Sequence, residues 1–295
     1  MSINAVSVAE VTSPAARARR FRGSPKLWIG LGIVGFFVLL GVIGPLFTEE
    51  PNAISDAGLT GPSAGHWLGT TQSGQDVLAQ LIAGTHGSLE IGLIIGVLAT
   101  VLSILVGVTG GYLGGRVDES FSLFTNVVLV IPGLPLVIIV TDYIEDRGVV
   151  TVALTITITS WAASARVLRA QTLSLRERDY VRAARASGER TWRIILVEIL
   201  PNLLPVIASQ FIFAIIFGIL SEAGLSFLGL GGTDHLSWGV MLHFSWTAQA
   251  LALGAWWWFV PPGLAIAVFG AGLSLINFSF DEVINPRLRT KGVRA

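Results

Sequence analysis

Six long runs without a charged side chain constrain the fold of this chain more than any other feature. A helix needs about 20 mainly apolar residues to cross the hydrocarbon core of a bilayer. The runs are residues 27–48, 91–115, 120–141, 148–165, 199–221 and 251–280. They lack the alternation of apolar and polar residues that is typical of membrane-barrel strands. The sequence therefore predicts an all-α membrane protein with six transmembrane helices.

The composition agrees with a chain that is solvated mostly by lipid. Charged residues make up 13% of it and hydrophobic residues 52%, whereas about a quarter of a typical soluble domain is charged. The chain contains no Cys, which excludes disulfides and thiol chemistry.

The basic residues predict the orientation in the membrane. With six spans, every Lys and Arg except Arg147 falls in the segments on one side. The positive-inside rule places that side, and with it both termini, in the cytoplasm. Adding or removing one span would mix the two sides. We therefore expect a multi-pass protein of the cytoplasmic (plasma) membrane.

The spans divide the chain into segments with different expected roles. Residues 1–26 are expected to form a cytoplasmic lead and 281–295 a cytoplasmic tail. The first span is interpreted as a retained helix rather than a cleaved signal, because its apolar run exceeds the usual length. Residues 49–90 are expected to form an external loop, and 91–280 the transmembrane core.

Two external segments carry apolar residues of their own. Within 76–87, Val77, Leu78, Leu81 and Ile82 recur at helical spacing, which predicts a short amphipathic helix at the interface. Residues 222–250 mix Gly with apolar residues, which is typical of a partly embedded or lid-like segment. The adjacent tryptophans 256–258 are expected to anchor the outer end of the sixth span in an aromatic belt.

The second span carries a stripe of small residues at spacings of three or four. Its members are Gly92, Gly96, Thr100, Ser103, Gly107 and Gly111. Such a stripe lets helix backbones approach closely in lipid, so packing is the favoured interpretation. A face that lines a passage is the alternative.

Proline and polar residues in the spans suggest a cavity. Pro132 and Pro135 in the third span, and Pro201 and Pro205 in the fifth, remove backbone donors and should bend their helices. The polar residues Asn202, Ser209, Gln210 and Glu222 are candidates for lining a translocation path, because exposing such groups to lipid is unfavourable. For Glu222, at the outer end of the span, a structural role in holding the loop is favoured over contact with substrate.

No catalytic residue and no metal ligand is expected. The four His residues lack a close metal-ligand spacing, and there is no nearby Cys. No nucleophile–base constellation stands out. We therefore expect a non-enzymatic chain.

The connection at 165–193, between the fourth and fifth spans, differs sharply from the rest of the chain. Residues 176–193, here called the knob, carry nine charges in eighteen residues. Helix formers run up to Gly188, which predicts a helix that ends there and a second short helix after it. Ala183 and Ala184 leave a surface without bulk that another protein could approach. On charge alone, a solvated basic loop facing lipid headgroups is the favoured interpretation.

The spacing in the knob favours protein docking. The segment resembles the signature loop of ABC importer permeases, in which Glu-Ala-Ala is followed after three residues by Gly, and after nine more by Ile, any residue, Leu and Pro. The residues that match this frame, or stand at its first position, are Arg182, Ala183, Ala184, Gly188, Leu200 and Pro201. Arg182 replaces the Glu of the pattern, and Glu198 replaces the Ile.

Further motifs resemble the dipeptide/oligopeptide (and nickel) branch of these permeases, C-type subunit. They are His-Trp-Leu-Gly-Thr at 66–70, Ser-Gly-Gln-Asp-Val-Leu at 73–78, Glu-Ala-Gly-Leu-Ser-Phe-Leu-Gly-Leu-Gly at 222–231 and Asn-Pro-Arg-Leu-Arg at 285–289. The last has Asn for Asp, and the stretch 277–282 departs from the pattern. The resemblance covers roughly residues 25–290.

The resemblance implies a type I ABC importer-like permease that moves di- or oligopeptides by alternating access. It also implies a second permease subunit, two ATPase subunits and an external solute-binding protein as partners, besides the lipid membrane; no nucleic acid partner is expected. The knob would couple the chain to an ATPase. No cofactor is expected in this chain, which lacks a G-x-x-x-x-G-K-[ST] phosphate loop, so ATP and Mg are expected on the ATPase subunits.

Other functions stay open at this point. A permease of the same branch could carry nickel, an oligosaccharide or a haem-like compound. A secondary transporter working alone is a further alternative, although the uncharged spans lack the ionisable groups expected for ion coupling.

Overall fold

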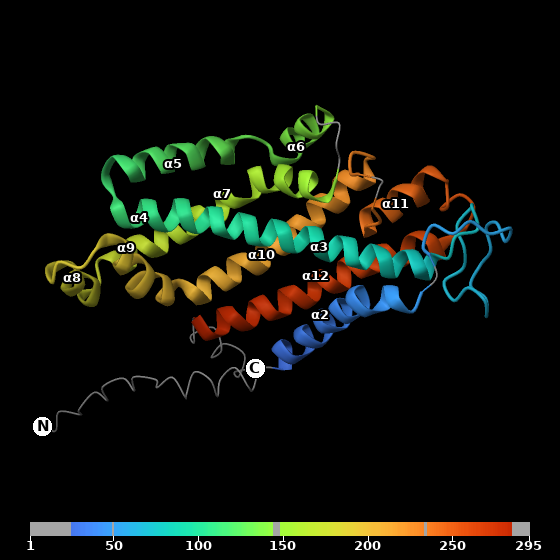
Figure 1. Cartoon of the computed structure of the whole chain (residues 1–295), viewed down its shortest axis with the longest axis horizontal. Coiled ribbons are helices and arrows are strands. Elements are labelled where there is room, and N and C mark those ends of the chain that lie inside the picture. Colours follow the sequence, from blue (N-terminus) through green and yellow to red (C-terminus); the bar gives the residue numbers. More distant parts are fainter. Residues whose placement is uncertain (1–24, 49, 144–147, 233–234, 285–295) are drawn as a thin grey trace, which may run out of the picture.

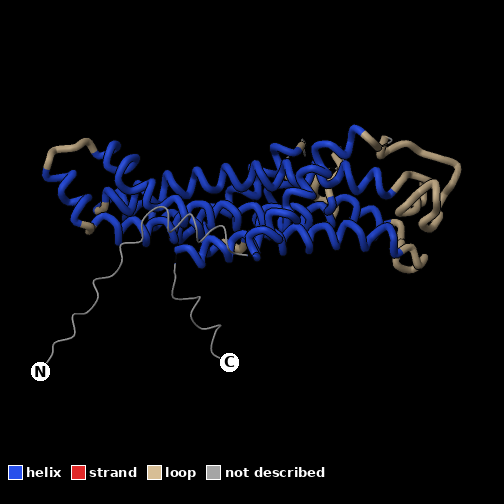
Figure 2. Tube along the Cα trace, turned by 90° about the horizontal axis from the view of Figure 1, so that it is seen from below, coloured by secondary structure: helices blue, strands red, loops and turns tan. Residues whose placement is uncertain are grey.

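The computed structural model of the chain describes residues 25–48, 50–143, 148–232 and 235–284. Residues 1–24 of the expected lead 1–26, Arg147 and the tail motif at 285–289 lie outside the described residues. Helices, short connections and one long loop between Leu46 and Val77, without a strand, make up the described part of the chain. They form an elongated bundle whose long helices follow its long axis (Figures 1 and 2).

The bundle consists of long helices and several short ones. The long helices are α2 (Pro25–Ile43), α3 (Val77–Ser103), α5 (Gly115–Val130), α7 (Val149–Arg176), α10 (Leu200–Phe227) and α12 (Trp256–Ile284). The shorter helices are η1 (Gly44–Leu46), α4 (Thr109–Leu113), α6 (Gly133–Asp142), α8 (Asp179–Ala186), α9 (Thr191–Arg193) and α11 (Trp238–Thr247). Two π-helical segments, η2 (Ile104–Val108) and η3 (Ile194–Ile199), join α3 to α4 and α9 to α10.

The helices account for the expected spans. Five continuous helical segments in the described residues are long and apolar enough to cross a membrane, and the bent pair α5–α6 makes a sixth if it counts as one span. The prediction of an all-α membrane protein with six spans is thereby confirmed, with the third span broken. α7 also runs past the predicted end of its span at 165, so the connection to the fifth span begins only after Arg176.

The third span breaks at the first of its two prolines. α5 ends at Val130, Ile131 is extended, and α6 starts after Pro132 at an angle of 82°. A residue before proline is driven out of the helical region, which explains why the break lies at Ile131. Pro135 lies in the first turn of α6, where its missing N–H costs little.

The short helix expected at 76–87 is not a separate element. Asp76 caps α3 by accepting a hydrogen bond from Ala79 N at 2.8 Å, and the helix then continues without interruption to Ser103. Gly84 and Gly87, the glycines inside 76–87, do not break the helix. They lie where α3 packs closely against the start of α11. A side chain at Gly87 would collide with the backbone of Leu236, just before α11. Within the segment expected to form the external loop, helix α3 therefore begins at Val77.

The small-residue stripe of the second span packs against two neighbouring helices. Gly92 and Gly96 of α3 face isoleucine side chains of α10. Gly107 lies against the backbone of Ala165 in α7, where an added Cβ would clash. Ser103 donates a hydrogen bond across the same contact to Trp161 O at 2.8 Å. These contacts confirm packing as the role of the stripe.

The three adjacent tryptophans at the start of α12 do not share one environment. Trp256 is 54% exposed and fits the expected anchoring role, whereas Trp258 is 4% exposed. Trp257 donates its indole N–H to Thr70 O at 3.2 Å, so it holds the loop before α3. The expected belt of three anchors is thus wrong for Trp257 and Trp258, because the outer loop folds over them.

Candidate functional site

The knob lies at one end of the bundle, opposite the loop that precedes α3 (Figure 1). Its first helix, α8, is fixed by Val181, whose side chain is completely buried. Val181 belongs to an apolar cluster with Leu168 of α7, Ile194 and Ile199 of η3, and Leu203 of α10. α8 is therefore packed directly against α7, η3 and α10.

The turn after α8 has the geometry that the sequence predicts. Gly188 has a φ of +76°, a conformation that residues with a Cβ rarely adopt. Its N–H donates to Arg185 O at 3.1 Å, and Glu189 N donates to Ala184 O at 3.2 Å. This pair of bonds is a Schellman motif, which ends a helix and reverses the chain. Two short helices joined by a glycine turn are thus confirmed.

The motif residues occupy two places on this end of the molecule. Arg182, Ala183 and Gly188 are exposed on the knob, and Ala184 is half-buried. Leu200 and Pro201 begin α10, after the π-helical segment. The space around Gly188 is open. The knob therefore presents a small-residue surface, with the exposed Trp192 at its second helix.

Arg182, which stands where the signature has Glu, forms an ion pair inside the knob. Its guanidinium donates to Glu177 Oε2 at 2.7 Å. This hydrogen bond, together with the positive charge of Arg182, lowers the pKa of the Glu177 carboxyl. The pair was not foreseen from the sequence, where the two residues stand five positions apart and are joined only by the turn between α7 and α8.

Other Arg residues tie the knob and α7 to the neighbouring helices. Arg185 of α8 lies over the Tyr112 ring of α4, with 5.3 Å from its Cζ to the ring centroid. Arg176 donates to Gly111 O at 3.3 Å. Arg169 of α7 holds Asp118 of α5 through two hydrogen bonds of 2.5 and 2.6 Å. The sequence analysis did not single out Tyr112 or Asp118. The one available signal was that Asp118 is an acidic residue next to the third span, on the side where the basic residues gather.

A cavity of about 490 Å³, here called the membrane cavity, lies between α5, α6, α7 and α10. Ile131 and Gly133, at the break between α5 and α6, line it on that side. Its polar groups include the hydroxyls of Thr159, Ser160 and Ser164 and the carboxamide of Gln210. The cavity is otherwise apolar, so it offers isolated hydrogen-bonding groups on a mostly hydrophobic wall.

The predicted lining residues do not come together. Only Gln210 reaches the membrane cavity. Asn202 is exposed and donates to Glu198 O at 2.7 Å within its own helix. Ser209 is buried and donates to Asn277 Oδ1 at 2.6 Å, which ties α10 to α12. Each of Asn202 and Ser209 thus makes a hydrogen bond within the fold and lies away from the membrane cavity, and their role in lining a path stays a prediction.

Glu222 has the structural role that the sequence analysis favoured, and does not line the membrane cavity. It is 1% exposed, and its Oε1 accepts hydrogen bonds from Ser226 Oγ at 2.7 Å and Ser237 Oγ at 2.6 Å. Ser237 caps α11 by accepting from Val240 N at 3.1 Å. Glu222 thus joins the end of α10 to the start of α11.

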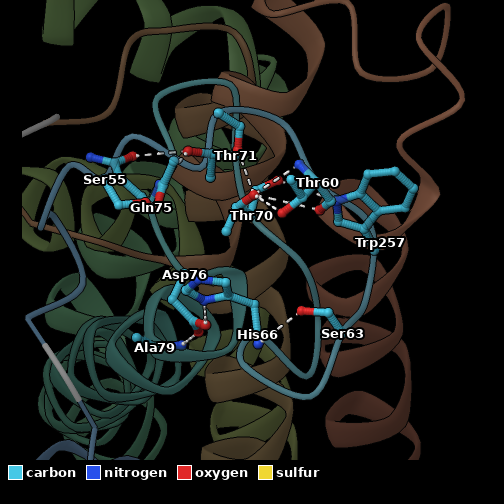
Figure 3. A network of polar contacts seen from close by, with 12 residues as sticks. Ser55, Thr60, Ser63, His66, Thr70, Thr71, Gln75, Asp76, Ala79 and Trp257 are labelled. Atoms are coloured by element: carbon cyan, nitrogen blue, oxygen red, sulfur yellow. Dashed lines mark hydrogen bonds and ion pairs between the residues drawn. The ribbon is translucent and has the colours of Figure 1, made fainter.

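The histidines also serve the fold. His66 Nδ1 lies 2.8 Å from Asp76 Oδ2, while the other oxygen of Asp76 caps α3 (Figure 3). In the same loop, the Thr70 hydroxyl lies 2.7 Å from the Thr60 hydroxyl and donates to Gly58 O at 2.6 Å. Among the described residues no group of three or more His, Cys, Asp or Glu could hold a metal. The motif at 66–70 therefore shapes the loop that leads into α3.

Comparison with known proteins agrees with this architecture. Residues 99–290 match the family described as binding-protein-dependent transport system inner membrane component. The chain is 31% identical to the dipeptide transport system permease protein DppC of Bacillus subtilis (strain 168), over 92% of this chain and 85% of that protein. It is 30% identical to the oligopeptide transport system permease protein OppC of the same organism, over 92% and 88% of the two chains.

A relative from another organism and a solved structure were also found to be similar to this chain. The oligopeptide transport system permease protein OppC of Mycobacterium bovis is 33% identical over 79% of this chain and 80% of that protein. In fold, the chain is similar to a chain of the MetNI methionine ABC transporter in an inward-facing conformation. The TM-score is 0.54 at 18% identity, over 70% of this chain and 95% of that one.

Proposed function

The chain belongs to the family of binding-protein-dependent transport system inner membrane components, and we propose that it conducts di- or oligopeptides as the permease subunit of an ATP-driven importer. The peptide cargo is supported by relatives named as dipeptide and oligopeptide permeases, which are similar to it over most of its length. Membership of this family also argues against a secondary transporter working alone.

One observation carries the coupling part of this proposal. The knob is fixed to the bundle by the buried Val181, while its small-residue surface around Ala183 and Gly188 is exposed. A solvated loop facing lipid headgroups would need no such rigid attachment. The knob is therefore the element that docks on an ATPase subunit, and Arg182, Ala183, Ala184, Gly188, Leu200 and Pro201 form the coupling region.

The mechanism follows from the contacts of the knob. ATP and Mg bind to two partner ATPase subunits, whose closure moves α8. The cluster around Val181 passes this motion to α7 and α10, and the contact of Arg185 with Tyr112 passes it to α4. Because α7 and α10 form two walls of the membrane cavity, the motion changes the side from which the cavity is open. The cavity thus alternates between two states, each open to one side of the membrane. ATP and the transported peptide each act by favouring one of these two states.

The membrane cavity is one half of the passage in this mechanism. A second permease subunit closes its open side, and an external solute-binding protein delivers the peptide. Gln210 and Thr159 present polar groups to a passing peptide, while the rest of the wall is mostly apolar. The chain itself contributes no catalytic residue to ATP hydrolysis.

Uptake by whole cells tests the proposal. Cells lacking this chain should lose uptake of labelled di- or oligopeptides and should recover it when the gene is returned. Purification of the tagged chain should bring ATPase subunits with it. Normal peptide uptake in the deletion strain, with loss of uptake of nickel or an oligosaccharide instead, would show that the cargo is wrong.

A further inference from the structure

Arg166 of α7 lies at the end of the membrane cavity that is nearer the knob, here called the rim. The lining residues closest to the knob are Val128 of α5, Val167 of α7 and Gln210 of α10. Arg166 directly precedes Val167 in the sequence. No charged side chain lines the cavity among the described residues. Arg166 is therefore the first charge along α7 between the cavity and the knob.

Arg166 shares its helix face with residues that line the cavity. Thr159 and Ala163 are lining residues, and Arg166 follows them by seven and three positions within α7. Residues at these spacings lie on one side of an α-helix, and three residues advance the helix by about 4.5 Å. Arg166 is exposed and is not itself a lining residue. It therefore lies at the rim, just beyond Ala163 toward the knob.

A hydrogen bond orients the guanidinium of Arg166 across the rim. Its Nη2 donates to Asn126 Oδ1 of α5 at 2.8 Å. Asn126 precedes the lining residue Leu129 by three positions, so both lie on one side of α5. This bond engages one of the five N–H groups of the guanidinium. The other four have no hydrogen-bond partner among the described residues.

The partner of Arg166 is neutral, unlike that of the next arginine along α7. Arg169 binds both carboxylate oxygens of Asp118. No carboxylate of a described residue forms an ion pair with Arg166, which is bonded to a carboxamide instead. A guanidinium binds a carboxylate through two parallel N–H bonds. Arg166 is thus held in place with its positive charge available to a carboxylate from outside the chain.

We propose that Arg166 binds the terminal carboxylate of a transported peptide at the rim of the membrane cavity. Asn126 orients the guanidinium, and two of its remaining N–H groups donate to the carboxylate. A linear peptide with a free C-terminus carries this group whatever its side chains are, so one residue serves many cargoes. The inference rests on the proposed function for the choice of a peptide as cargo. It adds a charged binding point to a cavity whose described lining is neutral.

The test measures peptide uptake by proteoliposomes that hold the assembled complex of this chain with its partner subunits and solute-binding protein, with ATP enclosed. The probes are labelled trialanine with a free carboxylate and labelled trialanine with a C-terminal amide. The ratio of their kcat/KM values, acid over amide, is compared between variants, and the solute-binding protein stays the same throughout. Arg166→Gln should lower this ratio about 2- to 5-fold through slower uptake of the acid, an effect typical of one exposed ion pair.

Three further variants separate the charge from its position. Arg116→Gln removes an exposed positive charge at the start of α5, away from the rim, and should keep the wild-type ratio. Arg166→Lys keeps a charge and should retain part of the preference for the acid. Asn126→Ala keeps the guanidinium but removes the acceptor that orients it, so its ratio should lie between those of the wild type and Arg166→Gln. Asn126→Ala carries the test if Arg166→Gln does not assemble.

Two results would overturn the inference while leaving the proposed cargo intact. One is an unchanged ratio in Arg166→Gln, or in Asn126→Ala where only that variant assembles. The other is an equal loss of acid and amide uptake, which would show that Arg166 pairs with a carboxylate of the second permease subunit or with a lipid phosphate. If the wild-type complex imports neither probe, the proposed cargo is wrong and the inference falls with it.

Discussion

Arg182 donates a hydrogen bond to Glu177 Oε2 at 2.7 Å, from the first helix of the knob back to the residue that follows α7. The position of Arg182 holds Glu in the signature of the permease family. This chain therefore keeps a carboxylate beside position 182, but Glu177 supplies it and Arg182 holds it. The knob retains both charges of an ion pair within one rigid unit.

The first prediction concerns this pair. Arg182→Glu should place two carboxylates side by side, displace the end of α8 and reduce peptide-stimulated ATPase activity of the reconstituted complex about 2- to 5-fold, a range typical of an exposed pair. The double exchange Glu177→Arg with Arg182→Glu restores the pair and should recover most of the stimulation. If the double variant is as impaired as the single one, Arg182 acts through direct contact with a partner instead.

The second prediction is the pH dependence of the same pair. The pKa of Glu177 is lowered in the folded protein, chiefly by the hydrogen bond from Arg182. Its contribution is therefore fully present above the pKa of the unfolded chain and is lost only as the pH falls through the lower folded value. Hydrogen exchange of α8 amides, corrected for the intrinsic rate, should show constant protection between about pH 6 and 8. The lowered pKa of Glu177 would be contradicted if α8 lost protection between these pH values in the wild type and kept it in Glu177→Gln.

The third prediction concerns the turn of the knob. Gly188→Pro cannot reach a φ of +76° and removes the N–H that donates to Arg185 O. It should abolish peptide-stimulated ATPase activity while the protein still inserts into the membrane. Gly188→Ala should be milder, because the space is open and only the left-handed backbone costs about 1–2 kcal/mol.

A glycine elsewhere provides the control for this pair of variants. Gly270 of α12 also has open space, without a positive φ, so Gly270→Ala should leave the ATPase stimulation unchanged. Normal coupling in Gly188→Pro would exclude the knob as the docking element.

The spans and the knob could be predicted from the sequence because each depends on local chemistry. The thickness of the bilayer sets the length of an apolar run, and Pro132 and Gly188 act through their own backbone preferences. The path of α3 was not predictable in the same way, because Gly84 and Gly87 suggest flexibility until the start of α11 is known to pack against them.

The surroundings of individual polar residues could not be predicted from the sequence either. Ser209 and Gln210 are neighbours in the sequence, but only the fold decides that Ser209 bonds Asn277 and Gln210 faces the membrane cavity. Trp256 and Trp258 are likewise two residues apart and differ in burial because the outer loop covers one of them. Such distinctions arise from contacts between distant segments, which a single sequence does not record.

The fourth prediction concerns the attachment of the knob. Val181 is completely buried in the cluster that joins α8 to α7, η3 and α10. Val181→Ala removes two carbon atoms from this cluster and should destabilise the attachment by about 1–3 kcal/mol. Hydrogen exchange in α8 should rise accordingly, and basal ATP hydrolysis should no longer respond to peptide.

A substitution on the surface of the same helix distinguishes the attachment of the knob to the bundle from its docking on a partner. Ala183→Ser changes an exposed residue and should leave the exchange of α8 amides unchanged. If Val181→Ala leaves both the exchange and the coupling intact, motion does not pass through this cluster.

The fifth prediction concerns Glu222, which joins α10 to α11 through Ser226 and Ser237. Glu222→Leu removes the acceptor for two buried hydroxyls and should lower stability by about 1–3 kcal/mol, with faster proteolysis between α10 and α11. Glu222→Gln keeps a carbonyl oxygen at the position of Oε1 and should behave nearly as the wild type, because both serines donate to that one atom. Thermal unfolding and limited proteolysis in nanodiscs measure the difference. If Glu222→Gln is as unstable as Glu222→Leu, the charge of Glu222 rather than its acceptor atom holds α11, and its role extends beyond the two serines.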